Sequence, residues 1–308
     1  MQMDSRIYIA GHNGLVGGAI CRYLTSNNYN NLIVRSHSEL DLCNQADVNQ
    51  FFQETKPEYV FLAAAVVGGI HANDSLPVEF LRDNLLIQTN IIEAAYRNNV
   101  KKLVFLGSTC IYPRDCPQPI KEEYLLTGPL EETNQWYAVA KIAGIKLCQA
   151  YRKEYGFNAI SLMPTNLYGP GDNFDLLSSH VLPALIRKFH EGKVNNAESV
   201  EVWGSGKPFR EFLYIDDLAD ACCFLIQNYN DASIVNIGMG QDISIKELAG
   251  LIKEVTGYQG QIVFNTSMPD GTPKKLCDVS KLKDLGWEYK TPLKKGIELT
   301  YNWYLDNV

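Results

Sequence analysis

The first half of the chain alternates short apolar runs with longer amphipathic segments. The apolar runs are rich in β-branched and aromatic residues, which predicts strands at residues 6–10, 32–35, 59–64, 102–106 and 159–163. The segments between them have helical spacing, which predicts helices at residues 15–26, 48–54, 79–98 and 137–155. Nearly continuous apolar strands that alternate with helices indicate a parallel sheet covered on both faces.

This rhythm changes after about residue 166, where turn-forming residues cluster at 168–173 and shorter, mixed elements follow. We therefore predict a Rossmann-type, doubly wound α/β domain over residues 1–170 and a smaller C-terminal α/β part over residues 171–308. Segments around residues 213–238 are expected to return to the first domain. Ligands of open α/β sheets bind at the carboxyl ends of the strands, so the second part is expected to lie at that edge.

Composition excludes several classes of partner. The formal net charge of −7 argues against general binding of nucleic acid or anionic membranes. No apolar run approaches the roughly 18 residues of a membrane span, and no leader pattern is visible at the start, so a cytoplasmic protein is expected. None of the eight cysteines forms a C-x-x-C pair, which favours free thiols and predicts no metal site.

A glycine-rich loop directly follows the first predicted strand. Gly11, Gly14 and Gly17 have the spacing G-x-x-G-x-x-G, and a predicted helix begins within the motif. Such glycines let the backbone approach a pyrophosphate, and the helix start offers unpaired N–H groups. The loop is interpreted as a dinucleotide site lined also by Asn13, Leu15 and Val16. The alternative is a purely structural turn.

The end of the second strand bears on the choice of dinucleotide. Arg35 stands 24 residues after Gly11, and an Arg near this position suits the 2′-phosphate of NADP, whereas an acidic residue suits NAD. NADP is therefore the predicted cofactor, although Arg35 could also be a solvated surface residue. Asp41 and Leu42 could hold the adenine, or Asp41 could simply form a turn. Ala64 ends the third strand with a small side chain that would let a cofactor lie close.

Catalytic candidates follow the fourth strand. Ser108 stands at its carboxyl end, and Tyr137 and Lys141 share one helix face at i and i+4. A lysine cation beside a phenol is expected to lower the pKa of the phenol, which could then donate a proton to a carbonyl oxygen near neutral pH. By itself such a pair is more often a surface pair.

Together these features resemble the extended short-chain dehydrogenase/reductase family over essentially the whole chain. More specific motifs resemble one branch of that family, the GDP-L-fucose synthases. These motifs stand at residues 64–70, 108–113, 163–170, 172–174, 179–185, 202–206, 210–213 and 269–275.

The resemblance implies a GDP-linked 4-keto-6-deoxy-D-mannose as substrate, epimerised at positions 3 and 5 and then reduced by NADPH at the ketone. It implies an acid–base pair formed by Cys110 and His180, with Tyr137 and Ser108 at the ketone oxygen. A cysteine is a competent base as its thiolate, and histidine exchanges protons near neutral pH. Residues expected along the cofactor are Leu106, Lys141, Pro164, Asn166, Leu167 and His180.

The resemblance also implies substrate contacts at Lys188, Trp203, Arg210 and Asp270. Arg binds phosphate through a planar fork, whereas Lys188 could be a surface charge and Trp203 a core residue. Some relatives carry Arg at the positions of Asn13 and His37. Here the NADP phosphate would depend on Arg35, on His37 if it is charged, and on backbone N–H groups.

Alternatives remain open at this point. Another nucleotide-sugar epimerase, dehydratase or reductase of the same family would share the glycine loop and the Tyr–Lys pair. A non-catalytic, dinucleotide-sensing protein is a rival of a different class, but such proteins often lose the Tyr or the Lys. Helical patterns at residues 81–96 and 136–151 could pack against a twofold mate, so a homodimer is expected.

Overall fold

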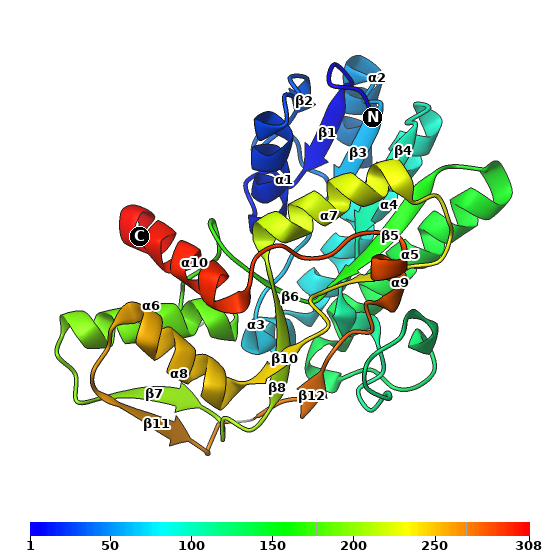
Figure 1. The fold of residues 1–308 in the computed structure, drawn as a ribbon. Helices are drawn as coiled ribbons and strands as arrows, with labels where there is room; N and C mark the ends of the chain where they lie inside the picture. Colours follow the sequence, from blue (N-terminus) through cyan, green and yellow to red (C-terminus); the bar gives the residue numbers. More distant parts are fainter. Residues whose placement is uncertain (177, 269) are drawn as a thin grey trace.

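Six parallel strands form the centre of the molecule in the computed structural model, which describes residues 1–176, 178–268 and 270–308 (Figure 1). Their order is β2-β1-β3-β4-β5-β9. The bounds are β1 Ile7–Ala10, β2 Leu32–Ile33, β3 Tyr59–Leu62, β4 Lys102–Leu106, β5 Ala159–Pro164 and β9 Val235–Ile237. Strand β1 pairs with β2 on one side and β3 on the other, so the winding direction reverses beside β1. The predicted doubly wound parallel sheet is confirmed.

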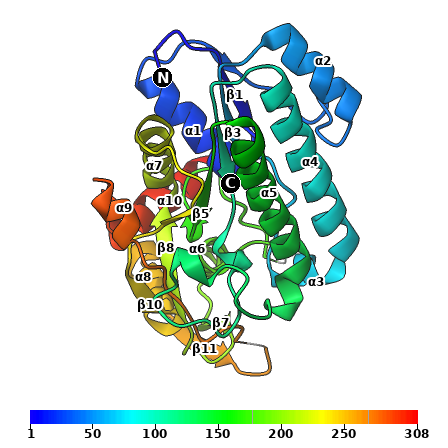
Figure 2. The same ribbon diagram turned by 90° about the vertical axis from the view of Figure 1, so that its right-hand side faces the viewer.

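Helices cover both faces of this sheet (Figure 2). One face carries α2 (Gln45–Thr55), α4 (Pro77–Arg97) and α5 (Gln135–Tyr155), and the other carries α1 (Leu15–Ser26) and α7 (Ile215–Asn228). Each layer has its own apolar core against the sheet. Because both faces are covered, the strand side chains are almost all buried, as their nearly continuous apolar sequences predict.

A second, smaller part extends from the carboxyl ends of the strands and has a third apolar core. Strand β8 (Phe209–Tyr214) is its central strand and pairs with β6 (Asn166–Tyr168), β10 (Asp242–Ser244) and β12 (Lys274–Lys275). Strand β7 (Ser199–Trp203) pairs separately with β11 (Gln261–Asn265). The helices of this second part are α6 (Val181–Val194), α8 (Ile245–Thr256) and α10 (Leu293–Asn307).

Short elements connect these layers. They are α3 (Ile70–Ser75), α9 (Ser280–Asp284) and the 3₁₀ turns η1 (Thr109–Ile111), η2 (Glu122–Tyr124) and η3 (Glu132–Asn134). Pro269, in the 269–275 motif, lies outside the described residues. Among the helices described, none is both long enough and apolar enough to cross a membrane.

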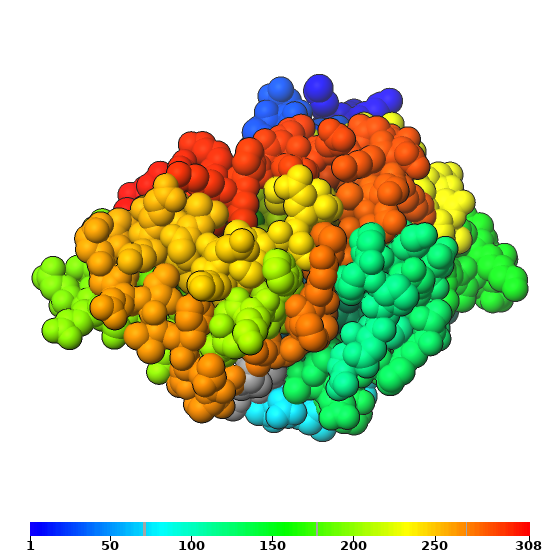
Figure 3. Space-filling model, turned by 60° about the horizontal axis from the view of Figure 1, so that its bottom comes forward, coloured from blue at the N-terminus to red at the C-terminus, as the bar shows by residue number. Residues whose placement is uncertain are grey.

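The loop after β4 meets the C-terminal segment directly. The backbone N–H of Ile120 donates to the carbonyl of Leu276 at 2.7 Å, and Asp278 N–H donates back to Ile120 at 2.8 Å. Figure 3 shows this junction, where the teal segment after η1 lies beside the orange segment that follows β12. The two parts are therefore joined by ladder-like backbone hydrogen bonds as well as by side-chain packing.

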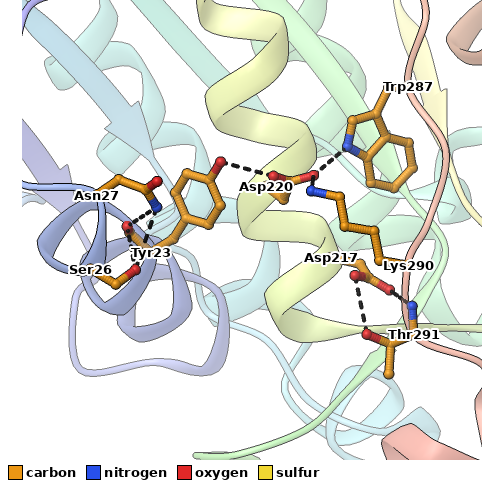
Figure 4. Close-up of polar contacts among 8 residues, drawn as sticks. All are labelled: Tyr23, Ser26, Asn27, Asp217, Asp220, Trp287, Lys290 and Thr291. Atoms are coloured by element: carbon orange, nitrogen blue, oxygen red, sulfur yellow. Dashed lines mark hydrogen bonds and ion pairs between the residues drawn. The ribbon is translucent and has the colours of Figure 1, made fainter.

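A partly buried carboxylate also fixes α7 against its neighbours (Figure 4). Asp220 accepts hydrogen bonds from the Tyr23 hydroxyl and the Trp287 indole, each at 2.8 Å, and pairs with Lys290 at 2.9 Å. Burial raises the pKa of Asp220, but the hydrogen bonds from its three partners together outweigh burial and hold the pKa below its ordinary value. One side chain thus links α1, α7 and the segment before α10.

Replacing Asp220 with Ala should lower the free energy of unfolding by about 2–3 kcal/mol, because the buried Trp287 indole and the partly buried Tyr23 hydroxyl lose their acceptor. Asp216 is the matched control, since it lies on the same helix and forms an exposed pair with Arg22. Asp216→Ala should cost less than about 1 kcal/mol. Urea unfolding at pH 7 measures both, and equal losses would contradict this role of Asp220.

Candidate active site

The glycine loop after β1 leaves no room for a side chain at Gly11 or Gly17. Gly11 has φ +87, and a Cβ there would lie 2.8 Å from the backbone N of Ala64, at the end of β3. A Cβ on Gly17 would lie 2.2 Å from the Gly11 carbonyl oxygen. Helix α1 then begins after Gly14 with no side-chain cap and no acidic residue in its first turn. Its N–H groups are therefore available to an anion, with Leu15 and Val16 in the first turn.

His12 is a residue that the motif analysis passed over. Its Nδ1 is buried and has no hydrogen-bond partner in the structure. Hydrogen bonds from Ser36 lower the pKa of Glu39, and the charges of Arg35 and His12 lower it further. These groups therefore lie together beside the glycine loop, whereas Asn13 is exposed. The sequence feature that could have identified His12 is its position as a polar, ring-bearing residue between Gly11 and Gly14.

The predicted NADP-selecting residues follow β2 at the surface. Arg35 is exposed, donates to the Val34 carbonyl at 2.7 Å, and places its guanidinium 5.5 Å from the centre of the Phe51 ring. His37 is also exposed. The guanidinium therefore remains at the solvent-facing rim, where an anion could reach it.

The adenine candidates lie in the turn before α2. The Asp41 carboxylate accepts the N–H of Cys43 at 2.9 Å, as a turn residue does. The Leu42 carbonyl is held by the Asn90 amide at 3.0 Å. The turn is thus fixed by α4.

Tyr137 and Lys141 lie on the first turns of α5, at the carboxyl end of β4. Lys141 is only 3% exposed and donates to the Leu106 carbonyl at 2.9 Å. Its ammonium lies 5.7 Å from the centre of the Tyr137 ring, which also packs edge-on against Phe80. Burial lowers the pKa of Lys141 to about 8.

The expectation that Lys141 lowers the pKa of the Tyr137 phenol is wrong for this structure. Burial raises the pKa of Tyr137 well above its ordinary value, and the nearby thiol of Cys110 raises it further. The ammonium makes its hydrogen bond to Leu106 instead of to the phenol. Desolvation therefore decides the direction of the shift.

Ser108 and Cys110 form the short η1 turn. The Ser108 hydroxyl oxygen accepts the N–H of Cys110 at 3.2 Å, and the Asn134 side-chain amide donates to Cys110 Sγ at 3.7 Å. A charge on Cys110 raises the pKa of both Tyr137 and Arg210. Because these effects need proximity, the thiol lies near the Tyr137 phenol of the first part and the Arg210 guanidinium of the second.

His180 begins α6 and makes no capping hydrogen bond with its side chain. The side chain is exposed to solvent, yet the surrounding protein lowers its pKa, which favours the neutral imidazole. The segment before it is held by the Gly69 N–H, which donates to the Ser178 carbonyl at 3.1 Å. No hydrogen bond joins His180 to Cys110 among the residues that the structure describes.

The predicted substrate residues form two groups. Lys188 places its ammonium 4.9 Å from the centre of the Trp203 ring, and Trp203 is 46% exposed, so it is not a core residue. Asp270 accepts the N–H and hydroxyl of Ser205 at 2.6 and 2.7 Å. Burial lowers the pKa of Arg210, while the charge of Asp270 opposes this effect. Aromatic and cationic groups therefore extend outward from the catalytic residues.

Comparisons with known proteins agree with this geometry. A family model, the NAD dependent epimerase/dehydratase family, matches residues 7–238. The chain is 60% identical over 305 residues to GDP-L-fucose synthase 1 of Arabidopsis thaliana, which covers 99% of this chain and 94% of that protein. It is similar in structure to a GDP-6-OMe-4-keto-L-xylo-heptose reductase from C. jejuni, with a TM-score of 0.95, 43% identity and coverage of 100% and 99%. It is also similar to a GDP-L-fucose synthetase from Naegleria fowleri bound to NADP, with a TM-score of 0.93, 33% identity and coverage of 100% and 94%.

The chain belongs to the NAD-dependent epimerase/dehydratase family, and within it to the GDP-L-fucose synthases. In this synthase fold, β5 and β6 bring Pro164, Asn166 and Leu167 to the same edge as Leu106 and Ala64. The Asn166 amide donates to the Glu211 carbonyl at 2.7 Å. Its side chain thus joins the paired strands β6 and β8.

Replacing Lys141 with Met should make the synthase more stable at pH 7, with an advantage that shrinks at higher pH. Below pH 8 the folded wild type carries a buried charge. Between pH 8 and about pH 10 the folded state has lost that proton while the unfolded chain keeps it, so wild-type stability rises with pH. The advantage of the variant should fall by roughly 2–3 kcal/mol over this window.

The measurement is urea unfolding of both proteins at pH 7 and pH 10. Lys146→Met is the control, because Lys146 lies on the same helix and is exposed. Its difference from wild type should not change with pH. A pH-independent effect of Lys141→Met would show that burial does not lower the pKa of Lys141 in the folded protein.

Proposed function

We propose that this chain converts GDP-4-keto-6-deoxy-D-mannose to GDP-L-fucose, by epimerisation at sugar positions 3 and 5 and NADPH-dependent reduction of the 4-ketone. One observation carries the proposal: the Cys110 thiol lies at the start of α5, where Asn134, three residues before Tyr137, donates to its sulfur at 3.7 Å. A reductase alone needs the Ser108, Tyr137 and Lys141 set. A thiol placed beside that set supplies the additional acid–base group that epimerisation requires.

NADP fits the residues at the glycine loop. The close approach of Gly11 to Ala64 leaves backbone rather than side chains along the phosphate path, and the start of α1 presents free N–H groups. Arg35 at the rim suits a 2′-phosphate. The relative from Naegleria fowleri was solved with NADP. When bound, NADPH supplies the hydride that reduces the ketone carbon.

Epimerisation follows from the acidity of the carbons beside the ketone. Removal of a proton leaves an enolate, and return of a proton to the other face inverts the carbon. Cys110 and His180 are the proposed acid–base pair: the Cys110 thiolate removes the proton, and His180, after taking a proton from solvent, returns it to the opposite face. Ser108 and Tyr137 donate hydrogen bonds to the ketone oxygen as its negative charge grows.

Reduction requires a proton at the same oxygen. The raised pKa of Tyr137 keeps its phenol protonated at neutral pH, so the proton is present when the oxygen becomes basic. Lys141 holds the Leu106 carbonyl and fixes the helix turn that carries Tyr137. We propose that it also contacts the nicotinamide ribose. Epimerisation and reduction therefore both use the ketone oxygen and the Tyr137 donor.

The GDP end of the substrate is proposed to lie along the second part. Arg210 would bind the diphosphate, since its guanidinium matches phosphate geometry. The exposed Trp203, with Lys188 against its ring, would take the nucleoside, with Asp270 nearby. Residues 1–170, with 213–238, would then hold the cofactor, and the remainder would hold the sugar nucleotide.

Two further predictions concern the whole protein. A homodimer through α4 and α5 stays a prediction, supported by the exposed Leu86 and Val139 on these adjacent helices. A cytoplasmic location also stays a prediction, supported by eight cysteines that are all free thiols in the structure.

The decisive assay supplies GDP-4-keto-6-deoxy-D-mannose and NADPH to the purified protein. NADPH absorbance should fall in proportion to the sugar converted, and NMR should identify GDP-L-fucose as the product. Cys110→Ser should then give the unepimerised, reduced sugar or almost no product, because the thiolate base is removed.

Each alternative gives a different result in this assay. Reduction without inversion by the wild type would indicate a reductase like the C. jejuni relative. No NADPH consumption would reject the synthase proposal and direct attention to other nucleotide sugars. Turnover without net NADPH oxidation would indicate an epimerase or a dehydratase.

Arg35→Ala should raise the KM for NADPH roughly tenfold and leave the KM for NADH within about twofold, because only NADPH carries the 2′-phosphate. Arg97→Ala is the control, since Arg97 is an exposed arginine at the end of α4 that pairs with Glu93. Steady-state kinetics with both cofactors tests this. Equal losses with NADH and NADPH would show that Arg35 does not select the cofactor.

A further inference from the structure

Asn134 stands at the position that precedes the first residue of α5, yet its side chain does not cap the helix. Asn is among the preferred residues at this position because its side-chain oxygen normally accepts an N–H of the first turn, a bond worth about 1 kcal/mol. Here the backbone has φ −121 and ψ 10 and no side-chain cap is formed. The side chain therefore points to another partner.

That partner is Cys110. The Asn134 amide nitrogen donates to Cys110 Sγ at 3.7 Å, across 24 residues of sequence. The other amide atom, Oδ1, is buried and has no hydrogen-bond partner. A buried oxygen without a partner is a cost to stability rather than a gain. Neither the nitrogen nor the oxygen of the Asn134 side-chain amide thus caps α5.

The backbone of Asn134 is firmly held. The Glu131 carboxylate accepts the Asn134 N–H at 3.2 Å and the Thr133 hydroxyl at 2.6 Å. The η3 turn also lies against α3. The amide is therefore presented to the thiol from a fixed turn, only three residues before Tyr137.

We propose that Asn134 is a positioning residue that holds Cys110 in its thiolate form, an assignment that rests on the proposed function for its catalytic meaning. The amide N–H donates to the sulfur at 3.7 Å, and the Arg210 guanidinium lies within electrostatic reach of the sulfur. A hydrogen bond to a charged acceptor is stronger than one to a neutral acceptor, so the amide favours the thiolate over the thiol.

The chemistry balances without any further reactant. The thiolate takes the proton from the carbon beside the ketone, and the electron pair of the C–H bond moves into the enolate. His180, after taking a proton from solvent, then gives that proton to the carbon on the other face, and the Cys110 thiol returns its proton to solvent. Asn134 exchanges no proton and acts only through the state of Cys110.

The test measures the rate at which iodoacetamide alkylates Cys110, resolved from the other cysteines by mass spectrometry of its peptide. Asn134→Ala should slow alkylation at pH 7 by about three- to tenfold, because less thiolate is present. At high pH, where thiols are ionised in both proteins, the rates should converge.

Two further variants separate this effect from damage to the fold. Asn134→Asp keeps the shape, removes the donor and adds a negative charge, so it should slow alkylation at pH 7 at least as much as Asn134→Ala. Asp is also a good residue before a helix, which favours folding. Gln135→Ala is the control, since the Gln135 amide donates to the Glu132 carbonyl and not to the thiol. Its alkylation should match that of the wild type.

Wild-type rates in both Asn134 variants at pH 7 would overturn the proposal. So would a loss of equal size at every pH, because that would show changed access to the sulfur rather than changed ionisation. A second readout is deuterium uptake at sugar positions 3 and 5 in D₂O without NADPH, which should fall in Asn134→Ala. If alkylation changes as expected but the wild type exchanges no deuterium, the positioning role stands and the proposed function fails.

Discussion

The arrangement of the site depends on one fully buried carboxylate, that of Glu211. Its two oxygens accept the N–H groups of Gly240 at 2.6 Å and Cys277 at 2.9 Å, and its carbonyl accepts the Asn166 amide. These partners lie after β9, after β12 and in β6, so one residue of β8 joins the six-stranded sheet to the second part. Burial raises the pKa of Glu211, and the two N–H donors oppose that effect. Because Arg210 is its chain neighbour, the same bonds determine where the guanidinium meets Cys110.

Much of this design could be predicted from local sequence. The parallel sheet follows from strands that are apolar along their whole length, and α1 begins and ends where its periodicity indicates. The glycine loop could be recognised because its spacing reflects a steric rule: a Cβ on Gly17 would collide with the Gly11 carbonyl oxygen. Tyr137 and Lys141 could be paired because i and i+4 share a helix face. Each inference needed only residues that are close in sequence.

What the sequence could not predict depends on contacts between distant segments. The direction of the Tyr137 pKa was predicted wrongly because burial, not the neighbouring charge, decides it. Trp203 could have been a core residue until β7 was seen with its alternate side chains exposed. Asn134 belongs to none of the sequence motifs, and only the structure shows its amide at the Cys110 sulfur. Glu211 lies within the 210–213 motif, but its hydrogen-bond partners Gly240 and Cys277 are 29 and 66 residues away in the sequence.

Burial gives the site a consistent electrostatic character. Desolvation by the surrounding protein lowers the pKa of Lys141 and His180 and raises that of Tyr137, so each group is displaced toward its neutral form. A negative charge on Cys110 or on the ketone oxygen therefore cannot depend on these groups for a full counter-charge. Arg210 remains protonated despite its lowered pKa, since a guanidinium does not lose its proton near neutral pH. The negative charge that forms during the reaction is thus balanced by Arg210 in the second part of the molecule, while Cys110 and Tyr137 of the first part transfer protons. Glu211 fixes the positions of these two parts relative to each other.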